Sequence, residues 1–277
     1  MSETEIPLSE ALGALGLPPD ASVTAAAGGA SGAAWRVSAA GAAYVLRFER
    51  SASLTDARIA AIAAARSAGL PAPALVGRRR VGDHEAVLLA WLPGITLLEA
   101  VTLAPATVSA WGLRMGDMQR RLHAVPAPSG LPAATTDPAH PFGAGRAVLG
   151  LPDGDRLLHL DWHPLNLIVD PERGEISGIV DWDNARAGHP LLDLARTESI
   201  MTLDPGVAGL PDELRARLAE FVDAWADGYG PEARAIPATC REWCGRVMLA
   251  DLEPRYGATP DLLDPIRRSI EAATVRG

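Results

Sequence analysis

The strongest constraint on the fold is a short polar motif that runs into a hairpin. The motif is HLDWHPLN, from His159 to Asn166. Two strand-like stretches follow, LNLIV at 165–169 and ISGIVD at 176–181, and the turn-like segment DPERGE joins them. The two strands of a hairpin lie side by side, so we expect Asn166 and Asp181 at the same end. One metal ion could therefore bridge these two side chains.

Two kinds of chemistry use the residues of this motif. In a metal-dependent hydrolase, Zn²⁺ or Mn²⁺ would be bound by His159, Asp161 and His163, with Asp181, His189 or Asp193 completing the site. Phosphoryl transfer instead needs one carboxylate for the proton of the attacking hydroxyl, and a second carboxylate with an amide oxygen to hold Mg²⁺. Asp161, Asn166 and Asp181 have the spacing of that set in protein kinases, so phosphoryl transfer is the favoured interpretation.

The order of the predicted elements indicates two lobes. Strands are predicted within 23–48, an alanine-rich helix at 54–68, and a buried strand at 85–92. Pro93-Gly94 interrupts this pattern, and the remainder is mainly helical, with helices predicted at 105–123, 190–201, 211–228, 237–251 and 260–275. The predicted fold class is α+β, with domains at 1–93 and 94–277.

The sequence HLDWHPLNLIV, followed by GIVDWDNARAGHPLLDLAR, resembles the signature of the aminoglycoside phosphotransferase and choline kinase-like family. This family is a branch of the protein-kinase-like fold, so the resemblance implies a small β-rich N-lobe that binds nucleotide and a larger helical C-lobe. It implies Asp161 as catalytic base and Asn166 and Asp181 as Mg²⁺ ligands. It also implies that His159 and Asp193 support the catalytic loop structurally.

Three positions depart from the family pattern without removing a base or metal group. Leu160 stands where the family usually has glycine, and Leu165 where glycine is common. His189 takes the place of a frequent aspartate before Pro190. We therefore expect the catalytic loop to keep its function.

The N-lobe should supply the nucleotide site. The segment GGASGAAW has the flexibility to cover phosphates, with Gly28, Gly29, Ser31 and Gly32 as candidates. The chain has no lysine, so Arg47 in YVLRF is expected to contact the α and β phosphates. The stretch from Leu88 to Leu92 resembles the hinge whose backbone receives the adenine, with Ala90 and Leu92 as candidates, and it leaves the choice between ATP and GTP open.

The helix that follows this strand departs from the kinase pattern. A kinase-like small lobe usually pairs the strand cation with a glutamate on that helix. The predicted helix at 54–68 has no glutamate, and its carboxylate is Asp56. Whether Arg47 pairs with a helix carboxylate is therefore left open by the sequence.

The acceptor is expected on the C-lobe side of Asp161. Acidic and aromatic groups suit a cationic molecule, and the candidates are Asp183, Asp251 and Glu253, with Trp225, Tyr229 and Trp243 on the C-terminal helices. The segment between His123 and His159 is shorter than in many antibiotic kinases of the family, which weakens the aminoglycoside assignment. An antibiotic, an amino alcohol, a sugar or an amino-acid derivative all remain candidates.

Composition excludes several other functions. The 277 residues carry a net charge of −9, which argues against nucleic acid as a partner. No apolar stretch is long enough to span a membrane and the start MSETE is acidic, so we expect a cytoplasmic monomer or homodimer with Cys240 and Cys244 reduced. The predicted function is a Mg²⁺- and ATP-dependent kinase acting on a small-molecule hydroxyl. The alternatives are a nucleotide-binding pseudokinase and the metal-dependent hydrolase.

Overall fold

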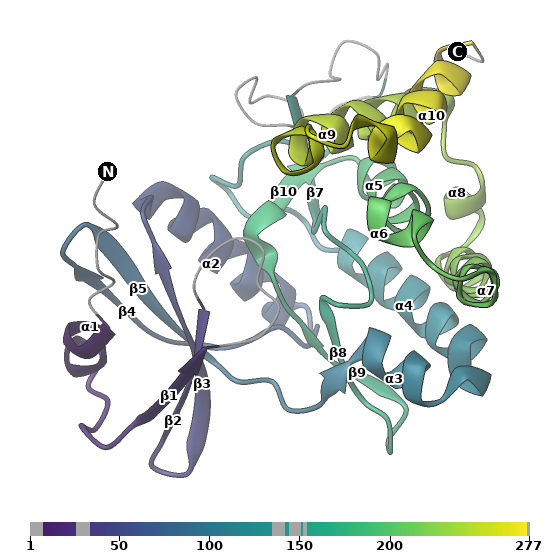
Figure 1. Cartoon of the computed structure of the whole chain (residues 1–277). Coiled ribbons are helices and arrows are strands. Elements are labelled where there is room, and N and C mark those ends of the chain that lie inside the picture. The colour runs from purple at the N-terminus through teal and green to yellow at the C-terminus, as the bar shows by residue number, and fades with distance from the viewer. Residues whose placement is uncertain (1–7, 26–33, 135–141, 144–150, 152–153, 276–277) are drawn as a thin grey trace.

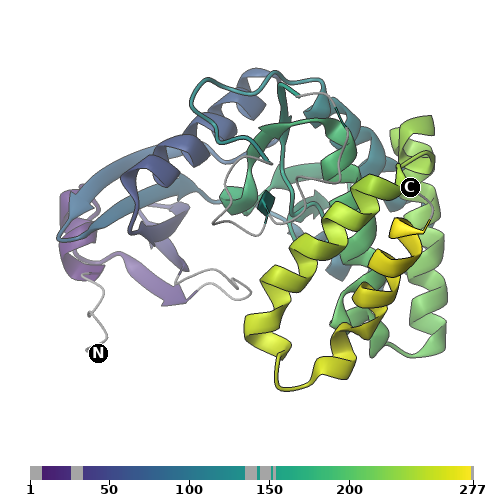
Figure 2. The same cartoon turned by 90° about the horizontal axis from the view of Figure 1, so that it is seen from above.

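The computed structural model describes residues 8–25, 34–134, 142–143, 151 and 154–275 of the chain. These residues form two lobes: a small lobe built on a β-sheet, at the left of Figure 1, and a larger helical lobe at the right. Figure 2 shows the same division from above, with the N-terminal and C-terminal helices far apart. The α+β bilobal architecture expected from the sequence is confirmed.

The N-lobe is a five-stranded antiparallel sheet in the order β1-β2-β3-β5-β4. Its strands are β1 (Ser22–Ala25), β2 (Ala34–Ala39), β3 (Ala42–Glu49), β4 (Leu75–Val81) and β5 (His84–Ala90). Two helices accompany the sheet, α1 (Leu8–Ala14) and α2 (Ala52–Ser67). In β5, alternate residues enter different cores: Leu88 packs in a small cluster with Ala11 of α1, whereas Leu89 joins the main core.

Helix α2 belongs as much to the main core as to the sheet. Its N-terminus is capped by Ser51, whose hydroxyl accepts a hydrogen bond from the Leu54 N–H at 3.4 Å. Its buried residues Ala61, Ile62 and Ala65 lie in the same hydrophobic cluster as the core of the C-lobe. This helix therefore lies between the sheet and the rest of the molecule, as Figure 1 shows.

The C-lobe combines helices with short strand pairs. Its helices of seven or more residues are α3 (Leu97–Leu103), α4 (Val108–His123), α5 (Pro190–Leu203), α7 (Asp212–Tyr229), α9 (Ala238–Tyr256) and α10 (Asp264–Thr274); α6 (Pro205–Ala208) and α8 (Pro231–Arg234) are single turns. Its strands are β6 (Ile95–Thr96), β7 (Arg156–Leu158), β8 (Leu167–Asp170), β9 (Glu175–Ile179) and β10 (Arg186–Gly188). Strand β8 pairs with β6 and β9, and β7 pairs with β10. The predicted boundary at 93/94 falls between β5 and β6.

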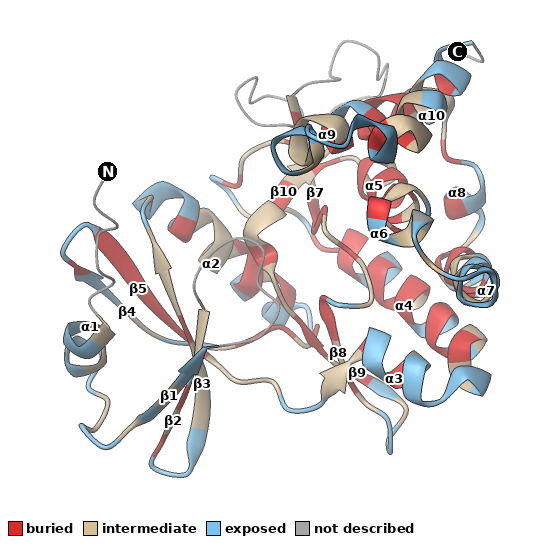
Figure 3. Ribbon diagram, viewed as in Figure 1, coloured by how far each residue is buried: buried red, intermediate tan, exposed pale blue. Residues whose placement is uncertain are grey.

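The buried centre of the C-lobe is formed by α4, α5 and the strands beside them, coloured red in Figure 3. Helices α4 and α7 approach closely because glycines line their contact. A Cβ atom added at Gly116 would lie 2.1 Å from the Trp225 carbonyl oxygen, and one at Gly228 would lie 2.1 Å from that of Leu113. No other residue type fits this contact without moving a helix.

Two sequence predictions need correction. Strand β4, whose sequence is LVGRRRV, was not predicted, because three adjacent arginines obscure the alternation of an edge strand. Asp181 was predicted to end the second strand of the hairpin, but β9 ends at Ile179. Asp181 instead has φ of 58°, in the left-handed region, where the chain turns into the short helix Trp182–Asn184.

Candidate active site

The catalytic loop is held from behind by one buried carboxylate on α5. Asp193 Oδ1 accepts a hydrogen bond from the Leu160 N–H at 2.8 Å, and its Oδ2 accepts one from the His159 N–H at 3.0 Å. The ring of His123, on α4, lies 2.9 Å from Oδ2 through Nε2. Burial alone would raise the pKa of Asp193, but the contacts with His123 and His159 hold it below the usual range. Asp193 therefore holds the backbone of two successive residues of the loop.

Leu160 explains the preference for glycine at its position. Its φ is 58°, in the left-handed region that L side chains rarely adopt, and its side chain is fully buried. The two bonds to Asp193 fix the residues on this turn, and the Leu160 carbonyl oxygen faces Arg196 Nε at 3.4 Å. The loop therefore has its expected form with a strained leucine in place of glycine.

Asp161 follows this turn and meets Asn166 and His163. The amide nitrogen of Asn166 donates to the Asp161 carboxylate at 3.0 Å and to its backbone carbonyl at 2.9 Å. His163 Nδ1 accepts from the Leu165 N–H at 3.3 Å, and its Nε2 lies 3.5 Å from Asp161 Oδ1 and 3.2 Å from the Asn166 amide nitrogen. Burial would raise the pKa of Asp161, but the hydrogen bond and charge of His163, with Arg196, lower it below the ordinary value. Asp161 is thus ionised at neutral pH, as a base must be.

The hairpin brings the two predicted metal ligands together. The Val180 N–H, next to Asp181, donates to the Asn166 carbonyl at 2.9 Å. The Asn166 amide nitrogen faces Asp161, and among the described residues no hydrogen bond to its side-chain oxygen is found. Burial, and then the charge of Asp183, raise the pKa of Asp181, while Arg47 opposes this shift. The backbone pairing of Val180 with Asn166 puts a carboxylate residue and an amide residue at the same end of the hairpin, and carboxylate and amide oxygens are a donor set that fits Mg²⁺.

His159 is buried and contacts the hairpin and two tryptophans. Its Nε2 donates to the Val180 carbonyl at 3.0 Å, and its ring lies against those of Trp162 and Trp182. Its Nδ1 is buried without a hydrogen-bond partner among the described residues. Because His159 faces Val180, it does not join Asp161 and His163 as the hydrolase alternative requires. Within the described ranges there is no group of three or more His, Cys, Asp and Glu side chains that could hold a metal ion.

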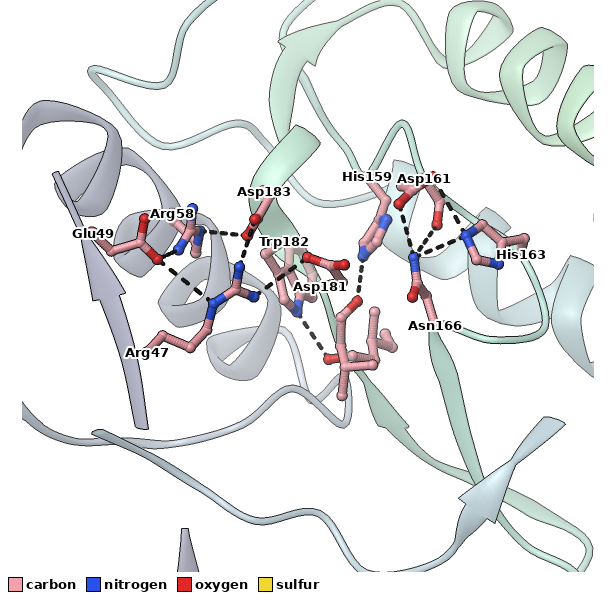
Figure 4. A network of polar contacts seen from close by, with 12 residues as sticks. Arg47, Glu49, Arg58, His159, Asp161, His163, Asn166, Asp181, Trp182 and Asp183 are labelled. Carbon is pink, nitrogen blue, oxygen red and sulfur yellow. Dashed lines mark hydrogen bonds and ion pairs between the residues drawn. The ribbon is translucent and has the colours of Figure 1, made fainter. Parts of the chain in front are cut away.

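Arg47 extends from β3 to the residues that follow β9, as Figure 4 shows. Its Nη2 lies 2.6 Å from Asp183 Oδ2, its Nη1 lies 3.4 Å from Asp181 Oδ1, and its Nε lies 3.6 Å from Glu49 Oε1. Burial would lower the pKa of Arg47, but these three carboxylates raise it, so the guanidinium stays charged. The predicted strand cation therefore lies beside the predicted metal ligand Asp181.

The carboxylate of α2 does not reach Arg47. Asp56 pairs with Arg78 of β4 and is largely exposed. The residue of α2 that does enter the site is Arg58, which pairs with Glu49 and lies 3.0 Å from Asp183 Oδ1 through its Nε. Sequence analysis missed Arg58 and Glu49. The available signal was the spacing of Arg47 and Glu49, which places both side chains on one face of β3.

The other predicted nucleotide contacts are only partly described. Gly28, Gly29, Ser31 and Gly32 lie outside the described residues. The Ala90 N–H donates to the Ala74 carbonyl at 2.8 Å, and the Trp91 N–H to the Ala43 carbonyl at 3.0 Å. Of the two predicted hinge residues, Leu92 lies beyond these bonds, so its backbone is better placed than the Ala90 N–H to meet a base.

The predicted substrate residues are in different surroundings from those expected. Asp183 is engaged by Arg47 and Arg58, and Asp251 lies 2.5 Å from the Arg196 guanidinium. Glu253 is exposed near the end of α9. The aromatic candidates are core residues, all buried, with polar atoms bonded within the protein: Trp225 to Gln119, Tyr229 to His123 and Trp243 to Phe142.

The fold and this site together define a kinase-like phosphotransferase. The sequence matches the phosphotransferase enzyme family over residues 22–151 and 146–243, and the chain belongs to that family. The match covers both lobes and includes Arg47, Asp161, Asn166 and Asp181.

Solved structures with the same fold include three phosphotransferases. A thermostable mutant of aminoglycoside phosphotransferase APH(4)-Ia aligns with a TM-score of 0.66 and 16% identity over 91% of this chain and 95% of that chain. A putative aminoglycoside phosphotransferase from Ralstonia eutropha JMP134 gives 0.63 and 16% over 95% of each chain. Spectinomycin phosphotransferase APH(9)-Ia, in complex with ADP and spectinomycin, gives 0.58 and 14% over 91% and 88%. Among curated proteins, none matches the sequence.

In the part of the chain that the structure describes, no helix is both long and apolar enough to cross a bilayer.

Proposed function

We propose that this protein transfers the γ-phosphoryl group of ATP to a hydroxyl group of a small molecule. The observation that supports this most strongly is the ionised Asp161, held by Asn166 on a loop that Asp193 fixes from behind. Such a carboxylate can orient the acceptor hydroxyl and take its proton as the phosphoryl group moves. Catalysis would then rest mainly on positioning and on neutralisation of charge.

The remaining residues have complementary parts in this proposal. Asn166 and Asp181 would hold Mg²⁺, which supplies neutralisation of the phosphate charge when it is bound. Arg47 would bind the α and β phosphates, because a guanidinium makes paired hydrogen bonds with phosphate oxygens and keeps its charge. The backbone of Leu92 would receive the base, which leaves the choice between ATP and GTP to experiment.

The acceptor we propose is a hydroxylated small molecule, with an antibiotic as one candidate among several. APH(4)-Ia has been solved with ADP and hygromycin B, and APH(9)-Ia with spectinomycin. In this chain, however, Asp183 and Asp251 are already paired with arginines. A strongly cationic acceptor would have to displace those arginines, so the acceptor panel should also include neutral sugars, amino alcohols and amino-acid derivatives.

Calorimetric titration with ATP, with and without Mg²⁺, tests the nucleotide site on the native protein and on Asp181→Ala. Binding that requires Mg²⁺ and collapses in the variant is the expected result. ADP release with the acceptor panel then tests turnover. Mg²⁺-dependent binding without turnover on any acceptor would favour a nucleotide-binding module, and no binding at all would end the kinase proposal.

A further inference from the structure

Two arginines and two carboxylates form a closed ring at the junction of the lobes. Arg47 and Glu49 come from the end of β3, Arg58 from α2, and Asp183 from the turn after Asp181 (Figure 4). Glu49 contacts both guanidinium groups, and so does Asp183. Going round the ring, each cation therefore stands between two anions. These side chains are between 13% and 20% exposed, so water screens the charges only weakly.

The two contacts of Arg58 differ in kind. Its Nη1 makes a hydrogen bond with Glu49. Its Nε lies 3.0 Å from Asp183 Oδ1, but the Nε–H bond does not point at that oxygen. Neither atom has a hydrogen-bond partner among the described residues. That second contact is therefore Coulombic, and it acts on the carboxylate that also binds Arg47 at 2.6 Å.

The ring determines where the Arg47 guanidinium can go. Glu49 and Asp183 hold its Nε and Nη2, while Nη1 lies at the longer distance of 3.4 Å from Asp181. If Arg58 were removed, Glu49 and Asp183 would each lose one of their two cationic neighbours and keep only Arg47. Both carboxylates would then be free to move, and Arg47 could close as a two-bond pair on Asp181.

We propose that Arg58 is a positioning residue that presents Arg47 to the nucleotide phosphates and keeps Asp181 available to a cation. This inference rests on the proposed function. In the kinase pattern, a helix carboxylate binds the strand cation directly. Here the helix supplies a cation, and two carboxylates outside the helix transmit its effect to Arg47. The charge on the helix is reversed, whereas its task is the same.

The test separates the phosphate-dependent part of nucleotide affinity from the rest. Dissociation constants for ADP and for adenosine are measured by calorimetry on the native protein, Arg58→Gln and Arg47→Gln. We expect Arg58→Gln to weaken ADP binding about tenfold, as the loss of one charge-assisted contact does, and to leave adenosine binding within twofold. An equal loss for both ligands would indicate a merely structural role and overturn the inference.

A double variant tests whether Arg58 acts through Arg47. If it does, Arg47→Gln combined with Arg58→Gln binds ADP no more weakly than Arg47→Gln alone. If the two losses add, Arg58 acts independently and the inference fails. Arg66→Gln is the matched control, because Arg66 lies on the same helix but is exposed and bonds only to the Ala72 carbonyl among the described residues.

A charge-exchange variant of Glu49 and Arg58 tests whether the whole ring is needed or whether the contact between these two residues is enough. In Glu49→Arg with Arg58→Glu, that pair is kept in reverse, but residue 58 then repels Asp183. We expect no recovery of ADP affinity, and recovery would show that the local pair suffices. Should Arg58→Gln melt below the assay temperature, Arg58→Lys replaces it, with a smaller loss expected for ADP alone. If the native protein binds no nucleotide, the proposed function fails; if it binds and only these variants behave otherwise, the inference alone fails.

Discussion

Asp161 combines burial with a lowered pKa, which sets a clear expectation for its removal. Asp161→Asn keeps the size of the side chain and removes the carboxylate that we propose takes the proton. We expect turnover to fall by about 10²–10⁴-fold, the usual contribution of general base catalysis. Nucleotide affinity should stay within a few-fold, since Asp161 is proposed to face the acceptor and not the nucleotide. ADP release and calorimetry measure the two effects, and unchanged turnover would remove Asp161 from the mechanism.

The left-handed backbone at Leu160 should reverse the usual order of stability of a glycine and an alanine variant. Leu160→Gly and Leu160→Ala both remove a fully buried side chain. In ordinary backbone, glycine would be the less stable by about 0.5–1 kcal/mol. At φ of 58°, alanine keeps a left-handed penalty of about 1–2 kcal/mol that glycine avoids. We therefore expect Leu160→Gly to be the more stable variant in urea unfolding, and the ordinary order would show that the turn relaxes.

At this scale the sequence predicts the residues whose roles follow from spacing along the chain. Asp161, Asn166 and Asp181 lie within one motif and one hairpin, so local geometry brings them together. Arg58 could not be predicted, because its role depends on how far α2 lies from the turn that holds Asp183. The pairing of Asp251 with Arg196 likewise depends on how α5 and α9 pack.

Helix α5 acts on the catalytic loop through Asp193, and this link is sensitive to acid. The pKa of Asp193 in the folded protein lies below the ordinary aspartate value, about 3.9. The stabilisation is therefore complete above that value and is lost as the pH falls through the lower folded pKa. His123, His159 and Tyr229 are the titratable groups nearest to it, directly or through His123.

Asp193→Asn should reduce the free energy of unfolding at pH 7 by about 3 kcal/mol or more, because it removes the buried charge that the loop N–H groups and His123 surround. The difference between native protein and variant should shrink as the pH falls below 4. Urea unfolding between pH 3 and 7 measures it. A difference that is independent of pH would show that the ionised carboxylate is not what stabilises the loop.

Because α4 and α7 pack closely, one methyl group added at their contact should strongly destabilise the folded protein. Gly116→Ala would place a Cβ atom against the backbone of α7, at 2.1 Å from the Trp225 carbonyl oxygen. We expect a loss of about 2–3 kcal/mol, typical of overpacking. Gly13→Ala in α1 is the control, since its added Cβ meets nothing within 4 Å and alanine favours a helix. Thermal unfolding of both variants decides between steric conflict and a general effect of the substitution.

Most helices were predicted because their apolar spacing and their terminal signals agree. The helix predicted at 54–68 is α2 at Ala52–Ser67, and that at 211–228 is α7 at Asp212–Tyr229. Strand β4 was not predicted, since an edge strand needs few apolar residues. Of its three arginines, Arg78 pairs with Glu85 at 2.7 Å and also with Asp56.

In the whole molecule, the boundary between the cores does not follow the boundary between the lobes. Helix α2 shares the main hydrophobic cluster with the C-lobe, whereas α1 packs in the small cluster on the sheet. We therefore expect the amides of α2 to exchange with solvent deuterium as slowly as those of α4 and α5. The amides of α1 and β1 should exchange much sooner. Exchange of α2 together with α1 would mean that the N-lobe opens as one unit.

Because the chain has no lysine, the cation that we propose for the phosphates, Arg47, is a guanidinium with no nucleophilic amine. Reagents that identify kinases by acylating a lysine next to bound nucleotide have no such target in this site, even when the enzyme is fully active. A glyoxal that condenses with arginine would be the suitable label, with ATP as the protecting ligand. Surveys of cell extracts that depend on amine capture would therefore overlook this enzyme and any relative that shares its arginine.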